Sequence, residues 1–412
     1  MRPSRRQFLH WLSALPIASA SIKTFAQPDS NRENRIAAII REYSAQGYHR
    51  TGTAVDTVSG AWLADRIQDM GVAPFLDPIE LDRVNVLYAS FEFGGQTIDG
   101  EPLYDCAYTD VAGITGSLGK LGSDADIGVI MLPPSTSSPA HTRLSEVRRE
   151  ARHKGIIIVS DSAYPADGIA TLNAEDFRAP VGPPTLQVAN KHWQALQEAI
   201  AQRQAGTLIA FCEHTPSKAY NVSARIDGSD PDLAPMVIMT PRSGWWRCAS
   251  ERGGGIALLL ELMRDLVANP PQRDVIFTAN SGHELSHLGL DQMLHENPRL
   301  ARDAFIWIHL GANFAATDSQ VRLQYSDQNI KNLTRRYLER ASLVPGIETA
   351  IENRPLGEAR NIFDAGGNFL SLLGNNSLFH HPDDRWPDAV DLATTARWAD
   401  AFSRIILDLS RA

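Results

Sequence analysis

Cysteine is scarce in this chain, and long apolar runs are missing after the N-terminus. Only three cysteines occur, Cys106, Cys212 and Cys248, and they form no C-x-x-C pair. They leave room for one disulfide, whose pairing the sequence does not decide. No segment beyond the N-terminus approaches about 18 uninterrupted apolar residues, so we expect no membrane span there.

The chain also lacks a basic stripe. Its formal charge is −9 and its pI is about 5.7. Lys and Arg are scattered, and we therefore expect no nucleic-acid partner. Hydrophobic residues make up 43% and charged residues 21% of the 412 residues. This balance is typical of a soluble globular protein, and the length is sufficient for two domains.

The N-terminus has the pattern of an export signal. Arg5 and Arg6 precede an apolar run from Phe8 to Ala20, and small residues that suit a cleavage site follow. Paired arginines before a modest apolar stretch indicate twin-arginine export, so we interpret residues 1–26 as a signal and expect a soluble, periplasmic or secreted mature protein. An ordinary secretory signal or a short membrane anchor is the alternative, although the run is short for a bilayer span.

Three regions follow this signal. Residues 27–85 contain two helical patterns, each ended by a glycine. Residues 86–215 hold short β-rich runs separated by Gly, Pro and Ser, with helical segments between them. We interpret this part as a smaller β-rich domain inserted into the chain, without metal ligands of its own. Residues 216–412 alternate strands with helices.

That alternation predicts an α/β fold with a largely parallel central sheet flanked by helices. In such sheets, ligands bind beyond the carboxyl ends of the strands. The candidate functional residues lie at these ends: Arg242 and Ser243 after one strand, His283 and Glu284 after the next, His309 near the end of a third, and His380 a loop beyond a fourth.

The segment "SGHELSHLGL" has the H-E-x-x-H spacing of a zinc site, with His283, Glu284 and His287. On a metalloprotease helix, both histidines would bind the metal and Glu284 would be the base. Here a strand and an Asn-Ser-Gly turn precede the motif. In a metalloprotease, the helix that carries the motif would already be present at these preceding residues. We therefore favour a strand-to-helix turn, in which His283 binds metal and His287 faces elsewhere.

Several segments, in order, resemble one known family: "NVSARIDGSD", "MVIMTPRSGWW", "ASERGGGIALLLELMRDL", "RDVIFTANSGHELSHLGL", "FIWIHLGA" and "FHHPDDRWPDAVDL". From about residue 35 to the C-terminus, the chain resembles the zinc aminopeptidases that include bacterial leucyl aminopeptidases, aminopeptidase Y and glutamate carboxypeptidase II. The resemblance implies the peptidase fold, and it implies that residues 86–215 are similar to the protease-associated domain inserted in many members.

The resemblance also assigns the family's metal-site positions. The bridging aspartate position falls on Glu251, and the base–ligand pair of glutamates falls on His283 and Glu284. The next acidic ligand position falls on His309, and the final histidine falls on His380. The first histidine of the family is replaced by Pro241. One ligand position is thus lost and the base position holds an imidazole.

Fewer acidic ligands favour one metal ion over the two that a carboxylate-rich hydrolytic site binds. We expect His283, His309 and His380 to supply nitrogen ligands, with Glu284 or Glu251 as the oxygen ligand. Three protein ligands and an open position are the usual catalytic zinc arrangement, so we favour one divalent transition metal, zinc before iron, copper or manganese. Asp384 is expected to position His380 without binding metal.

The resulting hypothesis is a metal-dependent hydrolase of an amide, peptide or related acyl bond, acting on a small molecule or peptide. Glu284 or Glu251 would take the proton, and Arg242 would stabilise the oxyanion. Trp245 and Trp246 follow a strand end and are candidates for an aromatic wall of the substrate site. The alternative is a catalytically inactive relative that binds a peptide, a metal or a partner in the same cleft.

Overall fold

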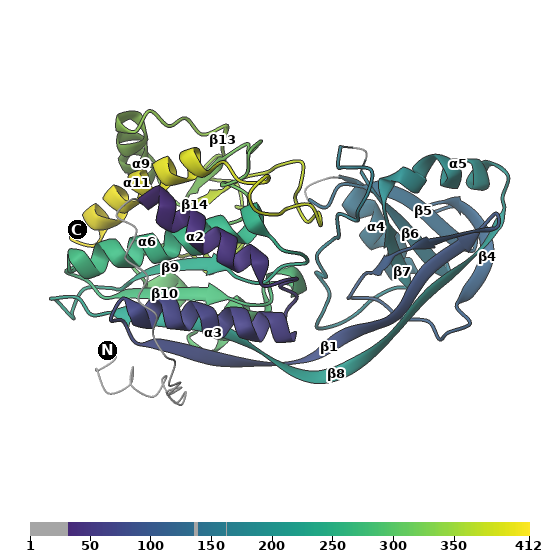
Figure 1. Cartoon of the computed structure of the whole chain (residues 1–412), viewed down its shortest axis with the longest axis horizontal. Helices are drawn as coiled ribbons and strands as arrows, with labels where there is room; N and C mark the ends of the chain where they lie inside the picture. The colour runs from purple at the N-terminus through teal and green to yellow at the C-terminus, as the bar shows by residue number, and fades with distance from the viewer. Residues whose placement is uncertain (1–31, 136–138, 162) are drawn as a thin grey trace.

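Two lobes, joined by one long pair of strands, make up the part of the chain that the computed structural model describes, residues 32–135, 139–161 and 163–412 (Figure 1). The expected export signal, residues 1–26, lies outside the described residues. The first lobe contains both ends of the described chain, and the second lobe contains its middle part.

The first lobe is built around parallel strands. Its strands are β9 (Met236–Pro241), β10 (Val275–Asn280), β11 (Ile306–Leu310), β12 (Arg322–Tyr325), β13 (Ile347–Glu348) and β14 (Phe369–Leu373). The strand order is β13-β12-β14-β11-β9-β10-β8. The four strands β14, β11, β9 and β10 are parallel to one another, and β12 runs antiparallel to β14. The expected α/β fold with a largely parallel central sheet is confirmed.

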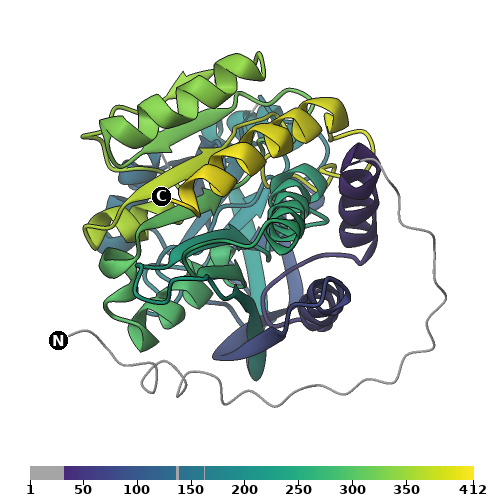
Figure 2. The same cartoon turned by 90° about the vertical axis from the view of Figure 1, so that its left-hand side faces the viewer.

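The central strands read as continuous apolar runs because both of their faces are covered. On β9, Met236 and Ile238 face one hydrophobic cluster and Val237 and Met239 face another. The first cluster is covered by α2 (Arg32–Ala45), α3 (Ala54–Asp69), α6 (Gly254–Ala268), α9 (Gln328–Arg340) and α11 (Leu392–Leu409). The second is covered by α7 (Leu288–Glu296), α8 (Leu300–Asp303) and α10 (Ala359–Asp364). Figure 2 shows α2, α6 and α11 packed together.

The beginning of α6 is pressed against the carboxyl ends of two strands. At Gly255, an added Cβ atom would lie 2.3 Å from Thr240 Oγ1 and 2.9 Å from the carbonyl oxygen of Leu310. Only glycine permits this approach without a shift of the backbone. The preceding π-helical turn η3 (Ala249–Gly253) therefore lies directly at the strand ends, and it brings Glu251 and Arg252 there.

The second lobe is a smaller α/β unit. Strands β4 (Ile114–Lys120), β5 (Ile127–Leu132), β6 (Gly155–Ser160) and β7 (Thr185–Val188) are parallel, and β3 (Glu101–Pro102) pairs antiparallel with β7. Helices α4 (Pro139–Glu150) and α5 (Trp193–Ala201) accompany them, and β2 (Gln96–Asp99) pairs with β1. Two hydrophobic clusters of this lobe are separate from those of the first lobe.

Strands β1 (Pro74–Phe93) and β8 (Ala205–Ile226) run through both lobes as one antiparallel ribbon (Figure 1). The ladder has a β-bulge between Val86 and Tyr88, and such bulges bend a strand and increase its twist. The expected limits of the inserted domain, 86 and 215, fall inside these two strands, almost opposite each other. The chain therefore passes between the lobes through continuous strands and not through linkers.

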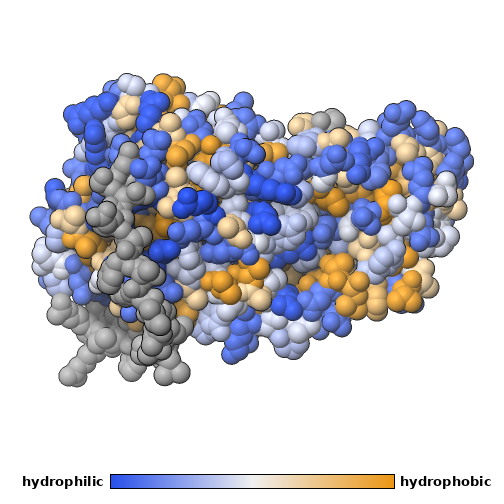
Figure 3. Space-filling view, in the orientation of Figure 1, coloured by the Kyte–Doolittle hydropathy of each residue, from blue (hydrophilic) through white to orange (hydrophobic). Residues whose placement is uncertain are grey.

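The described residues also bear on membrane association. On the face in Figure 3, most residues are hydrophilic, and apolar side chains form small scattered groups. Within the described residues, no helix combines the length and the apolar character that a bilayer crossing needs.

A buried histidine in the first lobe predicts acid sensitivity. His49 is fully buried, stacks on Tyr43 with ring centroids 3.8 Å apart, and has its Nε2 atom 3.0 Å from the Tyr43 carbonyl oxygen. Burial lowers the pKa of His49 from 6.5 to about 3. The unfolded chain therefore takes up the proton first, so stability is lost as the pH falls from 6.5 towards 3, by at most about 1.4 kcal/mol per pH unit.

We predict that His49→Phe reduces the loss of folding stability that accompanies a fall in pH. Urea unfolding between pH 7.5 and 4 should give a smaller slope of unfolding free energy against pH, by up to about 1.4 kcal/mol per unit. The exposed His295 provides the control, since His295→Gln should keep the wild-type slope. Equal slopes for wild type and His49→Phe would contradict the prediction.

Candidate metal centre

The H-E-x-x-H segment forms a turn between a strand and a helix. Strand β10 ends at Asn280, a short 3-10 turn η4 covers His283–Leu285, and α7 begins at Leu288. Ser286 and His287 between them are left-handed, with φ of 61° and 57°. The prediction of a strand-to-helix turn is confirmed. Non-glycine residues in this conformation store strain, and such strain is concentrated at functional sites.

Two histidines and one glutamate converge at this turn. His283 Nδ1 lies 2.5 Å from Glu358 Oε1, and the rings of His283 and His287 have centroids 5.1 Å apart. One ligand atom from each of the three residues lies within 4.8 Å of the other two, and no other such group occurs in the residues that the structure describes. The expectation that His287 faces elsewhere is wrong, because the left-handed backbone at Ser286 and His287 turns this side chain back towards His283.

His309 approaches the same carboxylate from β11. Its Nε2 atom lies 3.0 Å from Glu358 Oε2, and its Nδ1 atom lies 2.8 Å from Ser371 Oγ on β14. Gly357 makes this approach feasible: it has φ of +64°, and a Cβ atom there would lie 2.8 Å from His309 Cε1. A larger residue before Glu358 would push the loop away from His309.

Electrostatics keeps this group in a metal-binding protonation state. Burial lowers the pKa of His287 to about 3 and also lowers the pKa of His283, so both imidazoles are neutral near pH 7. Burial opposes ionisation of Glu358, but hydrogen bonds from His283 and His309 hold its pKa well below its usual range. Neutral imidazoles and an ionised carboxylate are the forms that bind metal ions.

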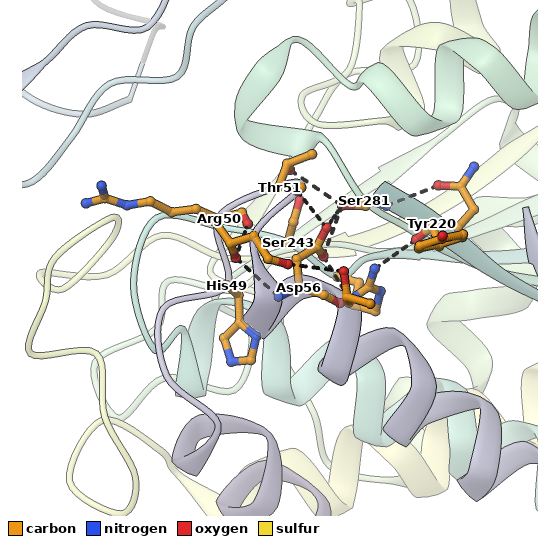
Figure 4. Close-up of polar contacts among 12 residues, drawn as sticks. His49, Arg50, Thr51, Asp56, Tyr220, Ser243 and Ser281 are labelled. Carbon is orange, nitrogen blue, oxygen red and sulfur yellow. Dashed lines mark hydrogen bonds and ion pairs between the residues drawn. The ribbon is translucent and has the colours of Figure 1, made fainter. Parts of the chain in front are cut away.

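Glu284 points away from its neighbour His283. Its Oε1 atom accepts hydrogen bonds from the Thr51 backbone N–H at 2.8 Å and from Thr51 Oγ1 at 2.7 Å, and its Oε2 atom accepts one from Ser243 Oγ at 2.6 Å. Figure 4 shows Thr51 and Ser243 among these polar contacts, beside Asp56. Residues 283 and 284 therefore have separate sets of contacts at one turn.

A second buried group surrounds Glu251. Its Oε1 atom lies 2.7 Å from an Arg252 nitrogen and 3.3 Å from His380 Nε2, and the three side chains are at most 1% exposed. Burial opposes ionisation of Glu251, but Arg252 and then His380 lower its pKa to about 2. The structure thus brings Glu251 and His380 together, as expected, but with a guanidinium as their neighbour.

The second lobe holds His380 in place. His380 Nδ1 lies 2.7 Å from the Thr171 carbonyl oxygen, and the Thr171 N–H donates to the His380 carbonyl oxygen at 3.2 Å. Asp384 accepts hydrogen bonds from the backbone N–H groups of Ser250 and Glu251 at 2.8 and 2.9 Å. Asp384 therefore fixes the turn that carries Glu251, whereas the role expected for it is to position His380.

The other candidate residues are more scattered. The buried Arg242 guanidinium contacts Asp56 Oδ1 at 2.9 Å and the carbonyl oxygens of Asp56 and Tyr220 at 2.7 and 2.8 Å. These partners are not among the expected site residues. Trp245 lines a cavity, whereas Trp246 is buried and donates from Nε1 to the His380 carbonyl oxygen at 2.8 Å.

That cavity, of about 330 Å³, lies on the Glu284 side of the turn. Its walls come from the first lobe, from strand β1 and from the second lobe. They are formed by Arg50, Thr51, Thr53, Arg83, Val84, Asn85, Val86, Tyr104, Phe177, Trp245, Glu284 and Leu285. A cleft of this size with aromatic walls and a few polar groups is typical of a small-molecule site.

Comparison with solved structures identifies the fold. A zinc aminopeptidase from Bacillus subtilis, BSAP, superposes with a TM-score of 0.76 at 15% identity, over 92% of this chain and 95% of that one. A peptidase M28 precursor from Shewanella amazonensis gives 0.75 at 15% identity, with 92% and 95% covered. An aminopeptidase from Aneurinibacillus sp. strain AM-1 gives 0.70 at 14% identity, with 92% and 94% covered.

The chain has the zinc-aminopeptidase fold. No protein-family model matches the sequence, and no curated protein matches it. The likeness to the solved aminopeptidases is therefore structural, and at 14–15% identity it extends to the fold alone.

The buried group at the end of β10 has the residue types that hold one divalent ion. His283, His287 and Glu358 offer two nitrogens and one charged oxygen, with His309 next to them. Glu251 is instead paired with Arg252, which neutralises its carboxylate. His380 lies outside the group of three. Glu358 has no counterpart among the sequence predictions, since it lies in the segment 349–358 between β13 and α10, which has no periodic pattern.

We predict a metal content of about one zinc ion per chain for the mature protein. His283→Ala, His287→Ala and Glu358→Gln should each weaken zinc binding by more than the 10- to 100-fold that loss of an outer partner costs. Elemental analysis and competition with a chelator measure this. His192→Ala and His214→Ala, in the second lobe or at its edge, are the controls. Full zinc retention by Glu358→Gln would contradict the assignment.

We also predict strong coupling between Glu251 and Arg252. Arg252→Met leaves a buried carboxylate without its cation and should lower the unfolding free energy by about 3–5 kcal/mol. Adding Glu251→Gln should restore part of that loss, because the charge is then gone. Chemical denaturation of the single and double variants gives the coupling energy. The exposed Arg302→Met should change stability by less than about 0.5 kcal/mol, and strictly additive effects of the pair would refute the coupling.

Proposed function

We propose that the protein is an exported, metal-dependent hydrolase that cleaves an amide, peptide or related acyl bond with a single metal ion, zinc before other metals. The observation that carries the proposal is the buried group of His283, His287 and Glu358 at the carboxyl end of β10, where α/β sheets bind their ligands. The aminopeptidase fold supports the same conclusion, since the similar structures are described as zinc aminopeptidases and a peptidase.

A divalent metal, when bound, supplies a Lewis acid and lowers the pKa of water. The chain itself has to supply a proton acceptor, and Glu284 is the residue that we assign to this role. It contributes to the cavity wall, and Thr51 and Ser243 hold both of its oxygens in place. Glu251 is less suited, because a carboxyl group with a pKa of about 2 is a weak base near neutral pH.

The remaining residues have supporting roles in this proposal. Arg242 forms an ion pair with Asp56 at 2.9 Å, and Asp56 accepts a hydrogen bond from Ser281 at 2.9 Å. In this proposal Arg242 therefore stabilises the turn before His283 and does not stabilise the oxyanion. Trp245 forms part of the substrate wall. Export rests on the twin-arginine pattern of residues 1–26 alone and places the enzyme in the periplasm or outside the cell.

The test is a substrate panel with the mature, zinc-loaded protein. We expect turnover of N-acyl amino acids, aryl esters or carbamates, and slow turnover of free-amine aminoacyl-nitroanilides. Glu284→Gln should lower kcat by about 10²- to 10⁴-fold, as removal of a general base does, without loss of zinc. Glu296→Gln, an exposed glutamate on α7, should leave kcat unchanged.

Three outcomes separate the alternatives. Chelator-sensitive and Glu284-dependent turnover supports the hydrolase. Fast turnover of free-amine nitroanilides would instead indicate an ordinary aminopeptidase. Zinc binding without turnover of any panel member would favour the inactive relative that binds its ligand in the same cleft.

A further inference from the structure

Arg83 lines the cavity next to Glu284 and forms no ion pair among the described residues. Arg83, on β1, donates from Nε to Asn85 Oδ1 at 2.8 Å and from Nη1 to the Gly52 carbonyl oxygen at 2.8 Å. Both acceptors are uncharged. Among the ion pairs of the described residues, none involves Arg83, and its second terminal nitrogen donates to no protein acceptor there.

The other charged groups of the cavity are already satisfied. Arg50 pairs with Glu101 at 3.1 Å, donates to Tyr104 Oη at 3.0 Å and lies over the rings of both Trp245 and Trp246. The Glu284 carboxylate accepts three hydrogen bonds from Thr51 and Ser243. The Arg83 guanidinium therefore still has a donor with which it can bind an anionic ligand. Arginine is suited to carboxylates because its donors form a rigid fork.

Part of the remaining wall is apolar. Tyr104, Phe177 and Trp245 contribute aromatic surface, and Val84, Val86 and Leu285 contribute aliphatic surface. The volume of about 330 Å³ lies at the small end of the range for ligand sites. One acyl or aryl group with a carboxylate fits such a volume.

We propose that this cavity binds a small carboxylate with an aryl or acyl group, with the anion at Arg83 and the apolar part against Phe177 and Trp245. Only the catalytic part of this inference rests on the proposed function. If the protein is the proposed hydrolase, N-acyl amino acids are its substrate class. Binding itself needs no turnover, so the two proposals can fail separately.

The experiment compares 4-phenylbutanoate with 4-phenylbutanol, which share a phenyl group and a four-carbon chain and have no hydrolysable bond. Calorimetric titration of the zinc-loaded protein should show the carboxylate binding at least about tenfold more tightly than the alcohol. Arg83→Gln should remove most of that difference, and Arg83→Lys should restore it only in part, because lysine keeps the charge without the fork. The exposed Arg302→Gln is the matched control and should bind like wild type.

A carboxylate could also reach the metal, and Glu358→Gln distinguishes this case. If Glu358→Gln abolishes the tight binding of 4-phenylbutanoate and Arg83→Gln does not, the anion sits on the metal and the proposal is overturned. It is also overturned if the alcohol binds as tightly as the carboxylate, or if neither binds. Selective, Arg83-dependent binding in a protein that cleaves nothing would support the site while the hydrolase fails.

Discussion

The buried charge of Glu358 is the constraint around which the candidate centre is arranged. At 2% exposure this carboxylate needs partners that favour its ionised form, because an isolated buried charge is very unfavourable. His283 and His309 provide them from the ends of β10 and β11, which are separated in the sheet by β9. Glu358 therefore reaches across the end of β9, and the positive φ of Gly357 before it leaves room for His309.

Much of the fold could be predicted because the central strands are buried on both faces. A run such as "MVIMT" of β9 is apolar throughout, and such runs are recognised without any partner. The 20-residue β1 and the 22-residue β8 were recognised only in part. Their middle sections, such as 77–85, contain charged residues exposed to solvent, and each strand is stabilised by a partner more than 100 residues away. No local pattern records such a pairing.

The candidate site shows the same division. His283 and His309 were found because strand ends are marked by apolar runs, and this signal is local. Glu358 and the direction of His287 were missed because both depend on left-handed backbone, at Gly357 and at Ser286 and His287. Side-chain periodicity does not report such conformations. The role of Arg252 could not be predicted for a different reason, because it depends on an ion pair with Glu251, which is itself buried.

The reciprocal hydrogen bonds between Thr171 and His380 tie the C-terminal loop of one lobe to the other lobe. They make the smaller lobe hard to remove or exchange, although it has hydrophobic clusters of its own. Cutting the ribbon at β1 and β8 would remove the partner of His380 Nδ1 and one of the two hydrogen bonds to the His380 carbonyl oxygen. If the second lobe were exchanged between related chains by recombination, the C-terminal loop that carries His380 would therefore have to be exchanged together with it.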